Sequence, residues 1–441
     1  MELAAEKRSV QTSVFMLSDT HGMTLDGNIP NFPIADVCIH AGDLTEESKL
    51  EEFHSAITLL RSIDAPLKLV IAGNHDFTLD TPSFEEKIQE IKPPLDPELV
   101  KKFYGDYEEA KQLLVSAKEE HGIHLLHEGT HDFVLQNGGK LRVYASPYTP
   151  SLGDWGFQYR PNDGHDFAIE AGTNIVITHG PPRGVLDRTN TRERAGCPHL
   201  FAAVARAKPQ IHCFGHIHEG WGAKMVAWRS KVSETPSFLT DIDNSASLLV
   251  EQLGTLHETK FDSPEDVDAK KEKLDKYTLQ KYCTASVPSD DQDGAGRKTL
   301  FVNASIKGDS PDADVQLPWL VDVMLPRELD MANSAVASHK DISAACCSDA
   351  SPKHSATVTD NNSSPKDSSQ NGPKEEQKNQ SLGMENVREK SEMVTKSEKR
   401  KFPVESRPYT ERTSGTKRSL EMDQAEGLQR KTRRKLPSGK K

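Results

Sequence analysis

Phe214-Gly215-His216-Ile217-His218-Glu219-Gly220-Trp221-Gly222 continues a short apolar run that begins at Ile211. A run of this length that stops at a glycine is typical of a buried β-strand. The two histidines then lie on the loop that leaves the strand, where their imidazoles can reach a cleft at the edge of a sheet. On its own a His-x-His pair is equally consistent with a polar surface loop, so its meaning depends on the other strands.

Four other apolar runs also end in residues of the kind that bind metals. They are Val14 to Leu17 before Asp19 and His21, Ala35 to His40 before Asp43, Leu67 to Ala72 before Asn74 and His75, and Asn174 to Thr178 before His179. In open α/β sheets, ligands bind at the carboxyl ends of the strands. The sequence therefore predicts that these six side chains meet His216 and His218 at one site.

The chemistry of these eight side chains indicates metal ions. Carboxylate, carboxamide and imidazole groups suit Mn²⁺, Zn²⁺ or Fe, and the set contains no cysteine. Eight side chains are too many for one ion, so we expect two divalent ions that share one carboxylate. Two ions about 3.5–4 Å apart can activate water and clamp the oxygens of a phosphoryl group during its displacement. A phosphate ester is therefore the expected substrate.

The complete motif series resembles that of the calcineurin-like metallophosphoesterase superfamily. The motifs are D-x-H at Asp19 and His21, G-D at Asp43, G-N-H-D at 73–76, H-G at His179 and G-H-x-H at 215–218. The stretches SPYTPSLGDWGF, THGPPRGVLDRT, FGHIHEGWG and LFVNAS are more narrowly similar to the small adult-brain-type metallophosphoesterase-domain proteins. The resemblance implies an α/β fold, a four-layer αββα sandwich with the metals at the carboxyl ends of the strands.

The resemblance also implies a role for each residue. One ion takes Asp19, His21, Asp43 and His218, and the other takes Asp43, Asn74, His179 and His216. His75 is the acid that stabilises the transition state or protonates the leaving group. Asp76 either orients His75 or caps a turn. Arg183 either contacts a phosphate or is an ordinary surface arginine.

The composition indicates a long segment without a packed core. Only 35% of the 441 residues are hydrophobic, and the mean hydropathy is −0.64. We expect a metallophosphoesterase domain at 10–326 with a charged insertion at 231–297, and a disordered tail at 327–441. Strands at 299–304 and 320–325 are expected to close the core after the insertion.

Local sequence patterns also predict a helix start near residue 45 and a surface segment at 80–100. Thr45 is expected to cap a helix whose first turn contains Glu46 and Glu47. Residues 80–100 are Pro-rich and acidic, so they are expected to form a surface excursion.

The C-terminal part of the tail is basic, whereas the rest of the chain is acidic. Residues 396–441 contain 15 Lys and Arg against 6 Asp and Glu. The clusters at 399–401 and 430–435 favour a nuclear import receptor or nucleic acid as partner, or are simply a solvated tail. The sequence shows no signal peptide and no apolar run near the ~18 residues that span a membrane, so no membrane partner is expected. The expected location is the cytoplasm or the nucleus.

The expected activity is that of a metal-dependent phosphoesterase hydrolase. The resemblance favours a phosphodiesterase that acts on a small substrate such as a cyclic nucleotide. The same core serves phosphomonoesterases and protein serine/threonine phosphatases. A scaffold without turnover is a third possibility, which the intact ligand set argues against, and a nuclease that uses the basic tail is a fourth.

Overall fold

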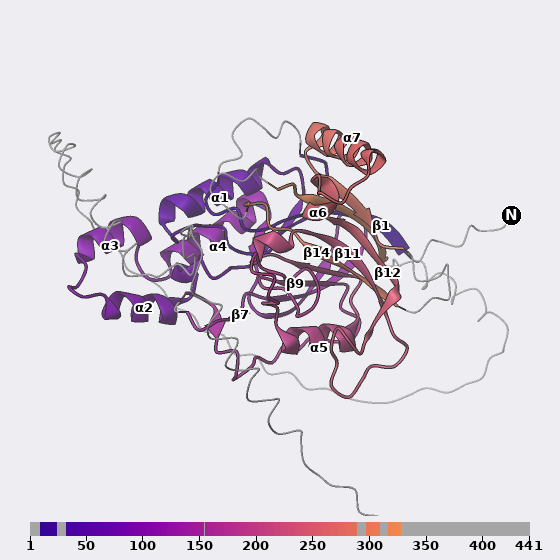
Figure 1. Ribbon diagram of the computed structural model, residues 1–441. Helices are drawn as coiled ribbons and strands as arrows, with labels where there is room; N and C mark the ends of the chain where they lie inside the picture. The colour runs from indigo at the N-terminus through magenta and orange to yellow at the C-terminus, as the bar shows by residue number, and fades with distance from the viewer. Residues whose placement is uncertain (1–8, 24–31, 154, 289–296, 309–315, 328–441) are drawn as a thin grey trace, which may run out of the picture. The chain divides into compact units, whose positions relative to one another are not determined.

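The computed structural model describes residues 9–23, 32–153, 155–288, 297–308 and 316–327 (Figure 1). Two β-sheets lie face to face over a buried apolar core. Helices cover the outer face of each sheet, so the described residues form the expected four layers, helix, sheet, sheet and helix. The tail predicted to be disordered and its basic clusters lie outside the described residues.

The first sheet has six strands in the order β13-β15-β1-β2-β3-β4. Their bounds are β1 Ser9–Leu17, β2 Val37–His40, β3 Leu67–Val70, β4 Ile123–Leu125, β13 Cys283–Ser286 and β15 Trp319–Pro326. Strands β1 to β4 run parallel, and β15 pairs with β1 in the antiparallel direction. The carboxyl ends of β1, β2 and β3 therefore lie along one edge of this sheet.

The second sheet has seven strands in the order β12-β11-β14-β10-β9-β6-β5. Their bounds are β5 Gly129–Val134, β6 Lys140–Ser146, β9 Ile175–Thr178, β10 Ile211–Phe214, β11 Gly222–Trp228, β12 Ile242–Gln252 and β14 Lys298–Asn303. Strands β6, β9, β10 and β14 are parallel. A separate short pair joins β7 Thr149–Pro150 to β8 Gln158–Tyr159.

The central strands are apolar on both faces because each face packs against another layer. In β1, Val14 and Met16 belong to the core between the sheets, whereas Phe15 and Leu17 face the helices on the other side. This alternation follows from the two-residue period of a strand. Strands buried on both sides read as continuous apolar runs, which is why the sequence locates them.

The helices attach through apolar faces. Helices α1 Leu50–Ser62 and α4 Glu109–His121 cover the first sheet through residues such as Phe53, Leu60 and Leu114. Helix α5 Pro198–Ala207 covers the second sheet through Phe201 and Val204. Among the described helices, none is both long enough and apolar enough to cross a membrane.

The strands expected before the five motifs are confirmed, and so are the two strands after the insertion, observed as β14 and β15. The cap expected at Thr45 is wrong. Helix α1 begins at Leu50 with Lys49 as its N-cap, so Glu46 and Glu47 lie on a loop before the helix. The side chain of Thr45 instead donates a hydrogen bond to Asp76 Oδ1 at 2.7 Å.

The segment at 80–100 is more ordered than a plain surface excursion. It contains helix α2 Thr81–Glu90 and the start of α3 Pro97–Tyr104, after the short helix η1 Phe77–Leu79. Phe84 and Tyr104 are buried against Phe77 in a small aromatic cluster. Trp155 packs against the same cluster, so this excursion supports a loop beside the predicted site.

The charged segment at 231–297 contributes to both sheets. Strand β12 forms the edge of the second sheet beside β11, and β13 forms the edge of the first sheet beside β15. Between them lie α6 Leu253–Leu256 and α7 Pro264–Gln280. Figure 1 shows α6 and α7 next to each other. The assignment of this segment as an insertion, and the domain bounds, stay predictions.

Candidate metal centre

The loops that leave β1, β2, β3, β9 and β10 bring the predicted ligands together. Three overlapping groups of side chains have possible ligand atoms within 4.8 Å of one another. They are Asp19, His21 and His218; His21, Asp43 and His75; and Asp43, His179 and His216. Asn74 joins the third group because its Oδ1 lies 3.0 Å from His179 Nε2. All eight side chains are therefore at one site.

Asp43 lies between two of these groups. Its Oδ2 is 3.3 Å from His179 Nε2 and 3.7 Å from His21 Nε2. Its Oδ1 accepts a hydrogen bond from the backbone N–H of His75 at 2.8 Å. The carboxylate is almost fully buried. One oxygen thus faces a histidine on each side while the other is held by the backbone.

Asp19 holds the loop that carries the two histidines of the opening stretch. Its carboxylate accepts hydrogen bonds from the backbone N–H of His216 at 3.0 Å and from Ser305 Oγ at 2.8 Å. His218 Nε2 lies 3.3 Å from Asp19 Oδ1. A residue near the start of the chain is therefore joined to the end of β10 and to the segment after β14.

The backbone at the site is unusual. Asp19, His21, Asp43 and His216 have φ angles of 56°, 46°, 53° and 69°. Few residues other than glycine adopt this left-handed region, and where they do the strain is often found at functional sites. Gly73 and Gly215 have no room for a Cβ atom, which would collide with the carboxylates of Asp43 and Asp19 respectively. These glycines let the loops approach the ligands closely.

The residues fit divalent metal ions. The His21 Nε2 atom, which faces Asp43, is buried and lacks a hydrogen bond to any described residue. Buried polar atoms are nearly always satisfied, so an ion between these side chains would satisfy it. The carboxylate, amide and imidazole donors form the set that Mn²⁺, Fe or Zn²⁺ accept. The assignment of each ligand to one of two ions stays a prediction.

Burial and neighbouring charges shift the pKa values of the acidic and imidazole side chains at the site. Burial alone would raise the pKa of Asp43, but His179, His75 and His21 together outweigh burial and hold the pKa well below its ordinary value. Burial lowers the pKa of His179, but the Asp43 carboxylate outweighs it and raises the pKa to about 9. At His216, burial and the charge of His179 outweigh the carboxylates of Asp43 and Asp19 and lower the pKa to about 3. A neutral His216 imidazole keeps a lone pair available for a metal ion.

His75 lies at the edge of this group. Its Nδ1–H donates a hydrogen bond to the backbone carbonyl of Glu46 at 2.7 Å. Its ring stacks on the indole of Trp155, with centroids 4.4 Å apart, and lies 4.7 Å from the ring of His21. The contact with Glu46 places the proton on Nδ1 and leaves Nε2 free to exchange a proton with a substrate.

The contacts of Asp76 bear on its two expected roles, orienting His75 or capping a turn. Its buried carboxylate accepts hydrogen bonds from the backbone N–H groups of Gly73, Leu44 and Thr45, and from the Thr45 hydroxyl. These bonds join the G-D loop to the G-N-H-D loop. The orienting contact to His75 comes from Glu46 instead, so the geometry favours the turn-capping alternative for Asp76.

Arg183 lies on the exposed loop after His179-Gly180-Pro181-Pro182. Its Nη1 donates a hydrogen bond to the carbonyl of Arg194 at 3.4 Å, on the same loop. This contact is compatible with the surface role. A contact with a phosphate stays a prediction.

The sequence reasoning missed several residues at the site. Ser305 follows β14, and its hydroxyl donates a hydrogen bond to Asp19. Like the other motifs, it is a polar residue that comes shortly after a strand. Glu46 and Lys307 form an ion pair next to His21. Its position after a strand could have suggested Ser305. The contact between Glu46 and Lys307 joins loops more than 250 residues apart and leaves no local sequence pattern.

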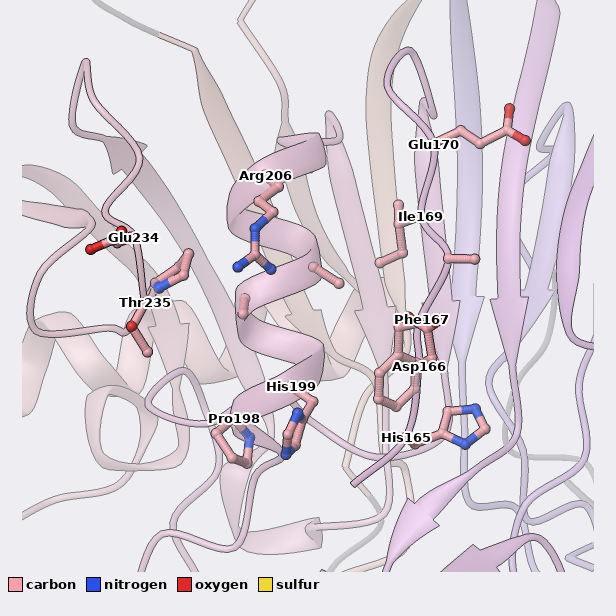
Figure 2. A pocket seen from close by; sticks show the side chains of 14 residues that line it. His165, Asp166, Phe167, Ile169, Glu170, Pro198, His199, Arg206, Glu234 and Thr235 are labelled. Carbon is pink, nitrogen blue, oxygen red and sulfur yellow. The ribbon is translucent and has the colours of Figure 1, made fainter. Parts of the chain in front are cut away.

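A separate pocket of about 690 Å³ lies beside α5 (Figure 2). It is lined by residues 165–170, by the α5 residues Pro198, His199, Ala202, Ala203 and Arg206, and by 234–236. Neither the seven predicted ligands nor His75 lines it. The cluster of metal-type side chains is thus distinct from this hollow.

Comparison with known proteins adds the family. Residues 13–220 match the family model of the calcineurin-like phosphoesterases, a range that includes all seven predicted ligands, His75 and Asp76. Over these residues, just under half of its length, the chain is similar to the calcineurin-like phosphoesterases. The metal-type side chains at the carboxyl ends of strands from both sheets lie within this similar part.

Individual relatives match just under half of the chain. The human metallophosphoesterase domain-containing protein 1 is 34% identical over 223 residues, which are 49% of this chain and 64% of that protein. A probable rhamnogalacturonate lyase C of Emericella nidulans is 33% identical over 218 residues, 49% of this chain but only 18% of that protein. The chain thus spans less than two thirds of these relatives.

A solved structure is also similar, at a low level. It is the purple acid phosphatase PPD1 from yellow lupin seeds, with 10% sequence identity and a TM-score of 0.29. The match covers 72% of this chain and 50% of that one.

Proposed function

We propose that this protein is a dinuclear metal-dependent phosphoesterase that hydrolyses a phosphodiester of a small molecule, such as a cyclic nucleotide. Asp43 carries the proposal, because one of its carboxylate oxygens faces His179 Nε2 at 3.3 Å and His21 Nε2 at 3.7 Å. A carboxylate shared between two groups of ligands is what a two-metal site requires. The narrower resemblance to small metallophosphoesterase-domain proteins supports the diester rather than the monoester.

The proposed ligands form two sets that share Asp43. The first set is Asp19, His21, Asp43 and His218, and the second is Asp43, Asn74, His179 and His216. Mn²⁺, Fe and Zn²⁺ all accept such donors. When bound, two ions stabilise the charge on the phosphoryl oxygens and make water a better nucleophile.

His75 acts on the leaving group in this proposal. Its Nδ1–H is committed to the Glu46 carbonyl, so the proton that moves is held at Nε2. The stacked Trp155 ring restricts rotation of the imidazole. A fixed imidazole can donate its Nε2 proton to the departing alkoxide oxygen, which is general acid catalysis.

The setting of the protein is also a proposal. We propose a location in the cytoplasm or the nucleus. The basic clusters at 399–401 and 430–435 would serve a nuclear import receptor or nucleic acid, and they lie outside the described residues. The substrate proposal does not depend on them.

Hydrolysis of two model substrates tests the function. Bis-p-nitrophenyl phosphate is a diester and p-nitrophenyl phosphate a monoester. We expect the wild type to cleave the diester only with added Mn²⁺, and Asp43→Asn to lose this activity. Asp132→Asn is the matched control, because Asp132 is exposed and pairs with Arg142 on the surface.

The other outcomes separate the alternatives. Cleavage of the monoester alone would favour a phosphatase and contradict the diesterase. Metal binding without turnover of either compound would contradict activity on simple esters and favour the scaffold. Equal activity of Asp43→Asn and Asp132→Asn would remove Asp43 from the site.

A further inference from the structure

Glu46 contacts two histidines of the centre in different ways. Its Oε2 lies 3.2 Å from His21 Nδ1, and its backbone carbonyl accepts the hydrogen bond from His75 Nδ1. The first separation is within hydrogen-bond range, although the two atoms are not aligned as a hydrogen bond. The opposite ring nitrogen of His21, Nε2, faces Asp43. Glu46 therefore stands behind His21, on the side away from the shared carboxylate.

The backbone of Glu46 is held in place by the start of helix α1. Glu52 Oε1 accepts a hydrogen bond from the backbone N–H of Glu46 at 3.3 Å. Glu52 Oε2 accepts from the backbone N–H groups of Glu47 and Lys49 at 3.1 and 2.9 Å. The loop between the G-D motif and the helix is thus wrapped around one carboxylate. These hydrogen bonds hold the backbone from which the Glu46 side chain extends.

Lys307 holds the other side of the Glu46 carboxylate. Its Nζ pairs with Glu46 Oε2. Lys307 lies two residues after Ser305, whose hydroxyl donates to Asp19. The segment after β14 therefore touches the centre at two points, Asp19 and Glu46.

We propose that Glu46 is a positioning residue of the metal centre, whose carboxylate orients the His21 ring while Lys307 holds that carboxylate. The inference rests on the proposed two-metal function. A carboxylate behind a metal-binding histidine fixes the ring orientation and keeps the proton on the far nitrogen, so the near nitrogen can bind the ion. In this chain Nδ1 is the far nitrogen and Nε2 the near one.

Titration of the metal-free protein with Mn²⁺ in a calorimeter tests the inference without using catalysis. Loss of such an orienting partner typically weakens metal binding about 10–100-fold. We expect a loss of that size for Glu46→Ala, and a substantially smaller loss for Glu46→Gln, which keeps an acceptor oxygen. Lys307→Met should weaken binding less than Glu46→Ala. Glu47→Ala is the matched control, because Glu47 is on the same loop but pairs with Lys49.

The outcomes distinguish this inference from the proposed function. Equal Mn²⁺ affinity of Glu46→Ala and Glu47→Ala, with wild-type binding intact, would overturn the role of Glu46 and leave the two-metal function standing. Absence of Mn²⁺, Fe²⁺ and Zn²⁺ binding by the wild type would overturn the function itself. If Glu46→Ala fails to fold by circular dichroism, Glu46→Gln and Lys307→Met decide, and wild-type affinity in both would overturn the inference.

Discussion

The imidazole of His75 stacks on the indole of Trp155, with ring centroids 4.4 Å apart and ring planes at 29°. The loop that carries Trp155 is joined to the ligand loops, since Gly156 N–H donates to the Asn74 carbonyl at 3.1 Å. Phe157 N–H donates to Asp80 Oδ2 at 2.7 Å. The aromatic loop is therefore part of the structure that holds the acid of the proposed reaction.

Replacing Trp155 should slow turnover. We expect Trp155→Ala to lower kcat on the diester about tenfold, because an aromatic pair contributes about 0.5–1.5 kcal/mol and about 1.4 kcal/mol corresponds to a factor of ten. Trp155→Phe should keep most of the activity, and Mn²⁺ affinity should stay unchanged in both. Leu152→Ala is the control, because Leu152 is on the same loop and 85% exposed. A kcat for Trp155→Ala equal to that of Leu152→Ala would rule out the positioning effect.

Replacing Asp76 should lower the free energy of unfolding. Asp76→Ala leaves the N–H groups of Gly73, Leu44 and Thr45 without their buried acceptor. Unsatisfied buried donors cost about 1–3 kcal/mol each, less where water reaches them, so we expect a loss of about 3 kcal/mol in the free energy of unfolding. Urea denaturation measures it, with the exposed Asp132→Ala as control. A loss below about 1 kcal/mol would mean that the two loops are held together by other contacts.

The ligand-bearing strands were predictable because they are buried on both faces. Such strands read as apolar runs, and the polar residue after each run marks the site edge, as with Thr178 and His179. Contacts between distant loops leave no such pattern. The proposed role of Glu46 depends on Lys307, 261 residues away. The wrong cap at Thr45 arose because Thr45, Glu46 and Glu47 stand shortly before a helix in the sequence.

The helices at 80–100 and strand β12 were not predicted, each because of its local sequence. Pro82 and Pro97, two of the four prolines at 80–100, occupy the first turns of α2 and α3, where a missing N–H costs nothing. Pro93 and Pro94 lie between the two helices. Strand β12 lies at a sheet edge and most of its residues are exposed or half-buried. An edge strand of this kind lacks the apolar alternation on which strand prediction depends.

Acid should destabilise the protein through His212, which lies in β10 outside the metal centre. His212 is fully buried, its Nε2 contacts Thr178 Oγ1 at 2.9 Å, and burial lowers its pKa to about 3. Because the folded pKa is below the ordinary value of 6.5, the unfolded chain binds the proton first as pH falls. The stability that neutral His212 provides is complete above pH 6.5 and is lost progressively between pH 6.5 and 3, at about 1.4 kcal/mol per pH unit.

Comparing two pH values isolates this contribution. We expect the free energy of unfolding to fall less between pH 7.5 and 5.5 in His212→Asn than in the wild type, by about 1.4 kcal/mol. His54→Asn serves as the control, because His54 is exposed on helix α1. An identical pH dependence of His212→Asn and the wild type would show that His212 does not set the acid sensitivity.

Phe238 should hold the loop at 183–197 in place. The Arg194 guanidinium lies 4.6 Å from the centre of the Phe238 ring, and the same arginine pairs with buried Asp187 at 2.6 Å. Gly184 lies so close to Phe238 that a Cβ atom there would collide with the ring. Removing the ring in Phe238→Ala should lower the free energy of unfolding by about 2 kcal/mol, and it should release the loop for cleavage after its arginines.

Limited digestion with trypsin follows that release directly. We expect faster cleavage within 183–197 in Phe238→Ala than in the wild type, because proteolysis tracks the population of locally opened states. Phe261→Ala is the matched control, since Phe261 lies in the same charged segment and is 84% exposed. If both variants were cut at the wild-type rate, Asp187 would be sufficient to hold the loop, because its carboxylate also accepts the backbone N–H groups of Gly184 and Gly196.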